Sequence, residues 1–230
     1  VFLATPLKIP WLVFGISLSG MILHLLCDLL TPWPIPILWP LSARTYSLDL
    51  IHFLDPFLLV VLVAGLLLAN RWSERGTLVV GLVILVIAGY LGFRAYGRQM
   101  AVHMVGDRAP TSRVAALPHR VNPVAWDVIV QEGGDYTCYV VDALQGEVQS
   151  SQAIHSTSDE RAKALSSNSA LVQAFLKRAR FPVAFVTQEG YRTTVEWQDI
   201  HLMISGGAVR GVKVVLDGRG EIIEEGFRFH

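Results

Sequence analysis

Long apolar runs fill the first part of the chain, and a shorter alternation of apolar and polar residues fills the second part. Three apolar runs indicate membrane-spanning helices: Pro10–Leu30, Phe57–Ala69 and Leu78–Phe93. The second run can reach across together with the residues that precede it. A polar turn at 70–76 separates the second run from the third. The apolar character recurs twice after the first run, and no basic stretch precedes that run, so a secretory signal is a poor interpretation of the start.

The segment between the first two runs is rich in proline and tryptophan. Thr31–Pro40 holds four prolines, which cannot continue a helix. Tryptophan in an apolar loop is typical of the membrane–water interface, where indole rings settle. We therefore expect this segment to stay at the interface without crossing the membrane.

From about Asp107 the apolar positions alternate with polar ones, which is typical of strands. Gly133-Gly134 separates Trp126–Glu132 from Asp135–Asp142 and predicts a hairpin. One helix is expected from Ser158 to Ala179, because acidic residues begin it and basic residues end it. Glycine-containing turns, Gly206-Gly207 among them, separate the further strands that we expect: Val183–Gln188, Tyr191–Trp197, Ile200–Ser205, Val209–Leu216 and Glu221–Glu225.

The predicted fold is therefore α+β. About three transmembrane helices in residues 1–105 precede a soluble antiparallel β-meander domain with one inserted helix in residues 106–230. Of the 19 basic and 19 acidic residues, 10 lie in the first part and 28 in the second. Trp126 and Trp197 are expected in the core of the sheet. Because Val1 lies within apolar sequence, we expect further sequence upstream of it.

Composition excludes several classes of protein. With 52% hydrophobic residues and a net charge of zero, the chain is not disordered. The same balance argues against a nucleic-acid binder that works through bulk positive charge, so no nucleic-acid partner is expected. Cys27 and Cys138 are too few for a disulfide framework or a cysteine-rich zinc module.

The strongest candidate chemistry is the pair of His24 and Asp28 near the end of the first apolar run. Residues four apart on a helix share a face, so both side chains can converge on one ion. Imidazole with carboxylate suits Zn²⁺, Mn²⁺ or Fe, and an ionisable group in an apolar span usually faces a cavity, a partner or a ligand. A His–Asp pair that serves only helix packing is the alternative.

Asp55-Pro56 has two interpretations. Aspartate followed by proline is an ordinary helix start, with Asp55 as the N-cap. A loop that stays on one side of the membrane would also return Asp55 to the face where His24 and Asp28 lie, which would make it a ligand or a general base. Asp49 is expected to be solvated.

The stretch from His24 to Pro56 resembles the bacterial YdjM-like inner-membrane proteins, which are described as LexA-regulated, membrane-bound, metal-dependent hydrolases. The shared pattern is present as His24, Asp28, Thr31, Leu38-Trp39-Pro40, Arg44, Tyr46-Ser47 and Asp55-Pro56. The family also carries an earlier motif of the type His-Arg-x-x-Thr-His-Ser, which this sequence does not contain. The resemblance therefore implies that these residues form half of a metal site.

By this resemblance the chain is expected to be a multi-pass protein of the bacterial inner membrane that binds a divalent metal ion, Zn²⁺ or Mn²⁺. His24, Asp28 and Asp55 are the expected ligands, and Asp55 is also the catalytic candidate. Membrane lipid is the expected partner, and a lipid-like phosphoester the expected substrate. The alternative is a non-enzymatic scaffold or sensor whose soluble domain binds a protein partner. If the soluble domain is cytoplasmic, five arginines lie on its side of the membrane and three basic residues lie on the other side, so the positive-inside rule favours that orientation over the periplasmic one.

Overall fold

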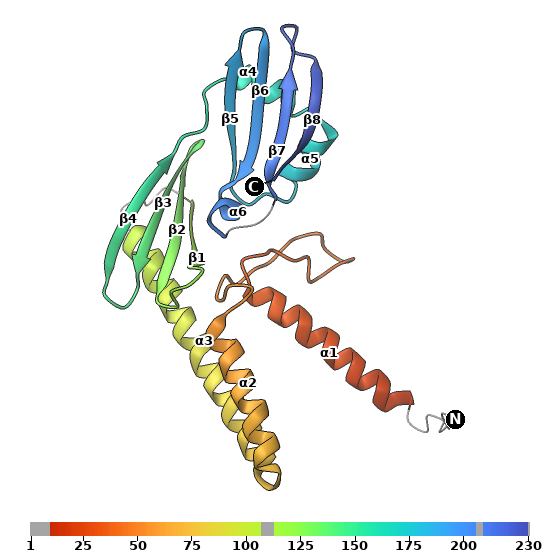
Figure 1. The fold of residues 1–230 in the computed structure, drawn as a ribbon, viewed down its shortest axis with the longest axis vertical. Coiled ribbons are helices and arrows are strands. Elements are labelled where there is room, and N and C mark those ends of the chain that lie inside the picture. The colour runs from red at the N-terminus through yellow and green to blue at the C-terminus, as the bar shows by residue number, and fades with distance from the viewer. Residues whose placement is uncertain (1–9, 107–112, 206–208, 230) are drawn as a thin grey trace. The chain divides into compact units, whose positions relative to one another are not determined.

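A computed structural model describes residues 10–106, 113–205 and 209–229. Contacts within the chain divide it into two units, Val1–Gln99 and Met100–His230. Helices form the first unit, and antiparallel strands form most of the second (Figure 1). The prediction of apolar N-terminal helices followed by antiparallel sheet is confirmed at this level.

The three predicted apolar runs all lie within helices. These helices are α1 (Pro10–Leu30), α2 (Pro56–Arg71) and α3 (Gly76–Gly106), and a 3₁₀ turn at Ser73–Arg75 precedes α3. Among the described helices, α1 and the stretch Ser73–Gly106 are long and apolar enough to cross a membrane. The apolar helix α2 has 16 residues and is shorter than such a span.

Helices α2 and α3 pack closely at a position where a side chain is missing. Gly65 is the buried residue of α2, and a β-carbon built on it would lie 2.5 Å from Cγ2 of Val83 on α3. Nearer the start of α2, the rings of Phe57 and Tyr90 lie 4.3 Å apart between centroids. A glycine and an aromatic pair therefore bring these two apolar helices into direct contact.

Helix α1 is held at its C-terminal end. None of its residues, all of which the structure describes, is buried. The chain that returns toward α2 covers its last carbonyl groups, which have no partner within the helix. The amide of Leu48 donates to the carbonyl of Leu29 (2.8 Å), and the amide of Leu50 donates to that of Leu30 (2.8 Å). The loop is thereby tied to the last turn of α1.

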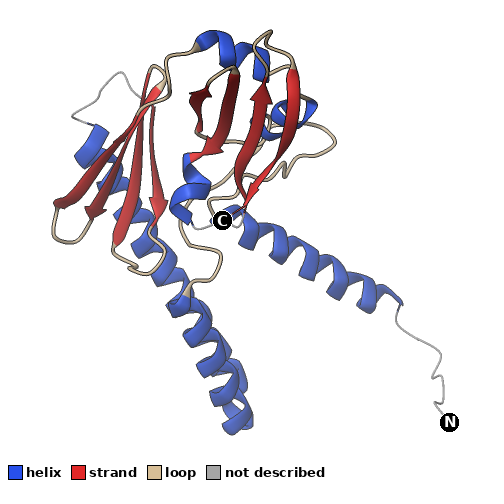
Figure 2. Cartoon of the chain, turned by 45° about the horizontal axis from the view of Figure 1, so that its top comes forward, coloured by secondary structure: helices blue, strands red, loops and turns tan. Residues whose placement is uncertain are grey.

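The second unit contains two four-stranded sheets where one meander was expected. The strand orders are β1-β2-β3-β4 and β5-β6-β7-β8, and each neighbouring pair is antiparallel (Figure 2). The predicted hairpin is present, with Gly133 at a φ of 63° in its turn. The strands are β1 (Arg113–Pro118), β2 (Ala125–Glu132), β3 (Asp135–Asp142), β4 (Glu147–Ile154), β5 (Pro182–Glu189), β6 (Arg192–Asp199), β7 (Val209–Leu216) and β8 (Ile222–Phe229).

The single helix expected from Ser158 to Ala179 is wrong, because two short helices stand there. They are α4 (Glu160–Ser166) and α5 (Ala170–Leu176). The hydroxyl oxygen of Ser169 accepts hydrogen bonds from the amides of Leu171 (3.1 Å) and Val172 (3.2 Å). A serine in this role begins a new helix, so the chain between the acidic start and the basic end forms two helices rather than one.

The strand expected at Ile200–Ser205 is also wrong, because these residues form helix α6. The side chain of Asp199 directs the chain here: its Oδ1 accepts from the amides of His201 (3.0 Å) and Phe181 (3.2 Å), and its Oδ2 accepts from the amide of Arg180 (2.8 Å). One buried carboxylate thus begins α6 and fixes the chain before β5. The turn predicted at Gly206-Gly207 lies outside the described residues.

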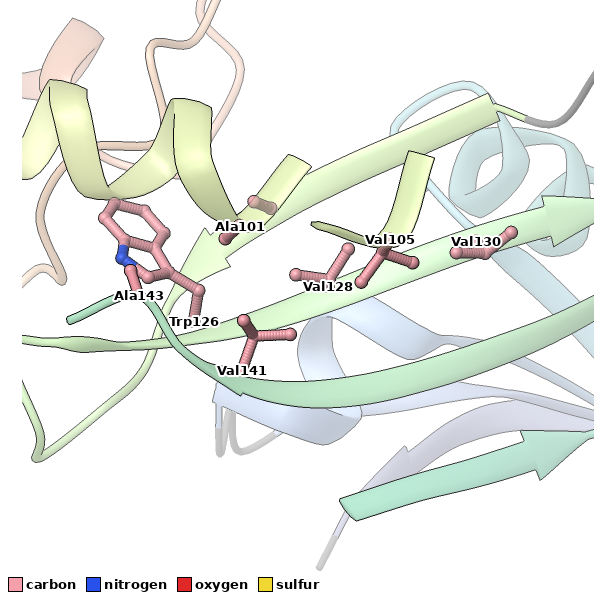
Figure 3. Close-up of a cluster of buried hydrophobic side chains, with 8 residues drawn as sticks. Ala101, Val105, Trp126, Val128, Val130, Val141 and Ala143 are labelled. Atoms are coloured by element: carbon pink, nitrogen blue, oxygen red, sulfur yellow. The ribbon is translucent and has the colours of Figure 1, made fainter. Parts of the chain in front are cut away.

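The hydrophobic core of the second unit includes the end of α3. Ala101 and Val105 are buried against Trp126 and Val128 of β2, as Figure 3 shows. A second cluster joins the two sheets, and a third lies between the second sheet and helices α4 and α5. The core position predicted for Trp126 is confirmed, since it is 1% exposed.

The contact between α2 and α3 gives a test of the helical unit. We expect Gly65→Ala to lower the free energy of unfolding in mixed detergent micelles by about 1–3 kcal/mol, the usual cost of overpacking. Gly81→Ala on α3 is the matched control, because a β-carbon there meets nothing within 4 Å. Both changes gain helix propensity. Equal stability of the two variants would contradict the close contact.

Candidate functional site

His24 and Asp28 lie on consecutive turns of α1 and face one another. The Nε2 atom of His24 is 3.5 Å from Oδ2 of Asp28. Their side chains are 77% and 36% exposed, so both can reach a ligand outside the helix. The hydroxyl of Thr31 instead donates to the carbonyl of Asp28 (2.7 Å), which closes the end of the helix. The structure therefore brings His24 and Asp28 together, as predicted, and Thr31 stabilises the backbone at Asp28.

Asp55 uses both of its carboxylate oxygens within the helical unit. Its Oδ1 accepts from the amide of Leu58 (3.1 Å), which makes Asp55 the N-cap of α2. Its Oδ2 accepts from the phenol of Tyr90 (2.7 Å) on α3. The structure therefore agrees with the interpretation of Asp55 as an N-cap, and a second hydrogen bond ties this cap to α3.

The three residues predicted as metal ligands do not form one cluster. Among the described residues, no three His, Cys, Asp or Glu side chains gather closely enough to hold a metal ion. The structure brings His24 to Asp28 and does not add Asp55 to them. One imidazole and one carboxylate have the donor atoms that Zn²⁺ or Mn²⁺ accepts, but a catalytic zinc site normally has three protein ligands. The pair therefore fits half of a metal site.

A row of polar side chains on α3, which we call the α3 polar row (Tyr90, Arg94 and Arg98), holds the loop before α2. These residues follow one another at intervals of four, so they lie on consecutive turns of one helix face. The Nε of Arg94, a residue that is 1% exposed, donates to the carbonyl of Leu50 (2.8 Å). Arg98 places Nη2 3.6 Å from Oδ2 of Asp49. Sequence reasoning missed this role, although the Tyr-x-x-x-Arg-x-x-x-Arg spacing was visible.

Asp49 is buried rather than solvated, so that expectation is wrong. It is 2% exposed, and its backbone has a φ of 54°, in the left-handed region that aspartate tolerates better than most residues. Its Oδ1 accepts from the hydroxyl of Ser47 (2.8 Å), and its Oδ2 faces Arg98. A buried carboxylate needs such partners, and they explain how it leaves water.

The second unit places a thiol, a carboxyl and an imidazole in one region of its first sheet. Burial, together with the charge of Asp127, raises the pKa of the Cys138 thiol to about 11. Burial also raises the pKa of Asp127, against an opposing effect of His119. The imidazole Nδ1 of His119 accepts from the amide of Asn122 (3.3 Å). A thiol that is protonated at neutral pH is a weak nucleophile, so this region does not resemble an activated cysteine site.

The hydrogen bond from Tyr90 to Asp55 can be tested directly. We expect Tyr90→Phe to lower the free energy of unfolding of the full chain in mixed micelles by about 1–3 kcal/mol, because a half-buried carboxylate oxygen loses its donor. Tyr96→Phe on the same helix is the control, since Tyr96 is 63% exposed. If Tyr90→Phe is no less stable than Tyr96→Phe, the hydrogen bond does not hold α2 against α3.

Comparison with known proteins agrees with the resemblance noted in the sequence. Neither the curated proteins nor the solved structures give a match to the chain. One family model does match, and it covers the helical unit with the His24–Asp28 pair and the whole α3 polar row. Residues 1–101 match the family of YdjM inner membrane proteins, which confirms the predicted family resemblance and supports a membrane protein of this kind.

Proposed function

We propose that the chain is a metal-dependent hydrolase of the bacterial inner membrane, and that it acts on a lipid-like phosphoester at the membrane surface. The observation that carries the proposal is the His24–Asp28 pair, with 3.5 Å between Nε2 and Oδ2 on an otherwise apolar helix. Ionisable side chains in such a helix cost a few kcal/mol each on insertion scales, so they are usually retained for a ligand or a partner.

In this proposal His24 and Asp28 hold a divalent ion, Zn²⁺ or Mn²⁺, and Asp55 is a third ligand or the general base. When bound, such an ion polarises a phosphoryl or acyl oxygen and activates water. The chain itself orients the pair: Thr31 closes the last turn of α1 beneath Asp28. Because Oδ1 of Asp55 caps α2, its Oδ2 would have to give up the hydrogen bond from the phenol of Tyr90 in order to bind the metal or a water.

The proposed topology has three membrane crossings. With a rise of 1.5 Å per residue, α2 extends over about 24 Å, a few ångströms less than a typical hydrocarbon core. Phe53 and Leu54, 70% and 73% exposed, lengthen its apolar part on the N-terminal side. The second unit would then lie in the cytoplasm, as the distribution of basic residues predicts. An interfacial site would meet lipid head groups without extracting the lipid.

The alternative is a non-enzymatic membrane scaffold or sensor, and one observation favours it. Both carboxylate oxygens of Asp55 are engaged by Leu58 and Tyr90, so its contacts are those of a structural residue. His24 and Asp28 would then serve helix packing, and the second unit would bind a protein partner. Metal binding by the full chain separates the two functions.

The proposal predicts that the full chain, purified in detergent, contains zinc or manganese. We expect His24→Ala and Asp28→Ala each to lower affinity for the added metal by roughly tenfold or more, since the loss of a supporting residue alone costs 10–100-fold. Metal content measured by mass spectrometry and zinc titration by calorimetry provide the readout. Leu25→Ala is the matched control, because it removes an exposed apolar side chain from the same turn of α1.

The outcomes discriminate between the functions. Wild-type metal content in both the His24→Ala and Asp28→Ala variants would contradict the proposed metal site. Asp55→Asn and Tyr90→Phe then assign the role of Asp55. If Asp55 is a metal ligand, only the Asp55→Asn variant binds less metal. If Asp55 is purely a structural cap, both variants are less stable and both keep their metal.

A further inference from the structure

The loop between α1 and α2 presents a compact apolar tip. We define the tip as residues 37–41, which include the end of the Pro/Trp segment Thr31–Pro40 that is predicted to lie at the interface. Trp39 is 70% exposed and Leu41 is 92% exposed, and Ile37 and Leu38 are exposed as well. Apolar side chains gathered at one end of a loop indicate an interaction surface rather than a solvated turn.

The tip is held in place by hydrogen bonds at its base. Ile35 and Tyr46 form an antiparallel bridge, in which each amide donates to the other carbonyl at 3.0 and 2.9 Å. Directly after the tip, the amide of Ser42 donates to the carbonyl of Leu38 (3.0 Å) and closes the tip. The apolar side chains are therefore presented by an ordered projection, which reduces the entropy that binding would cost.

Both ends of the loop belong to apolar helices, and this indicates what covers the tip. The returning chain is bonded to the last turn of α1 through Leu48 and Leu50, and the loop ends at Asp55, where α2 begins. In a membrane protein, a loop that joins the ends of two such helices starts and finishes at one membrane surface. Figure 1 shows it leaving the C-terminal end of α1. The nearest apolar phase is the leaflet in which the helices end.

The charge of the loop complements an anionic leaflet. Its acidic side chains, Asp49 and Asp55, are engaged by groups of the α3 polar row. Arg44 is exposed, and its guanidinium lies 5.7 Å above the ring of Tyr46, beside the bridge that closes the base. A cation next to an apolar tip is the arrangement with which interfacial segments bind anionic lipid.

We propose that the tip inserts into the head-group region of the adjoining leaflet, and that Arg44 contacts the phosphates of anionic lipid there. This interaction does not depend on hydrolysis or on a metal. It brings lipid phosphate to the base of a loop whose far end is bonded to Leu29 and Leu30 of α1, the two residues that follow Asp28. The loop is thus a lipid-binding surface beside the His24–Asp28 pair.

Spin labels on the full chain in lipid nanodiscs test the proposal. In a Cys27→Ser, Cys138→Ala background, a nitroxide is placed by Leu41→Cys, and its collisions with oxygen and with a water-soluble nickel complex are compared. Leu144→Cys in the second unit is the control, because Leu144 is 63% exposed in the turn between β3 and β4. Nanodiscs of phosphatidylcholine alone are compared with nanodiscs containing phosphatidylglycerol.

We expect oxygen collisions to dominate at Leu41 and nickel collisions to dominate at Leu144. Phosphatidylglycerol should deepen the Leu41 label, and Arg44→Gln should abolish that difference. Nickel access at Leu41 equal to that at Leu144 would overturn insertion, and equal depth in both lipids would overturn the role of Arg44. Protection of Leu41 from both reagents would mean a protein partner, which also overturns the proposal.

A second measurement avoids the cysteine background. Brominated lipid should quench the native tryptophan fluorescence, and Trp39→Phe should remove part of that quenching. Trp197→Phe in the second sheet is the control and should leave the quenched component unchanged. If the two variants lose the same amount of quenching, Trp39 does not lie in the leaflet.

Discussion

The helical unit depends on one constraint, which is that polar groups at the end of apolar helices must find partners within the chain. Arg94 is buried. A buried charge without hydrogen bonds would cost more free energy than the net stability of a typical folded protein. The bond from Arg94 to the carbonyl of Leu50 satisfies part of that need and holds the loop at the same time. Arg98 with Asp49 and Tyr90 with Asp55 repeat this pattern on the neighbouring turns.

This constraint gives structural roles to many residues of the YdjM-like pattern. Thr31 closes the end of α1, Tyr46 forms the base of the loop, and Ser47 holds the buried carboxylate of Asp49. Asp55 begins α2. His24 is different, because its side chain faces Asp28 and both side chains remain accessible. Within the motif, these two residues are therefore the ones best placed for chemistry.

The sequence predicted elements whose signals are local and missed those that depend on distant partners. Helix α1 begins at Pro10, where the first apolar run begins. Helix α2 begins at Pro56, directly after its N-cap Asp55. Strand β4 was missed because most of its residues are polar, and the break before α5 was missed because the acidic start and basic end of 158–179 indicated one helix. The partner of Arg94 is 44 residues away, so no local pattern could indicate it.

Hydrogen exchange tests most directly whether the α3 polar row holds the loop. In the full chain in nanodiscs, the amides of Leu48, Leu50 and Ile51 donate to the end of α1 and should exchange slowly. Arg94→Met should increase their exchange rates, whereas Arg75→Met, in the 3₁₀ turn that precedes α3, should leave them unchanged. Slow exchange of these amides in the Arg94→Met variant would contradict the account.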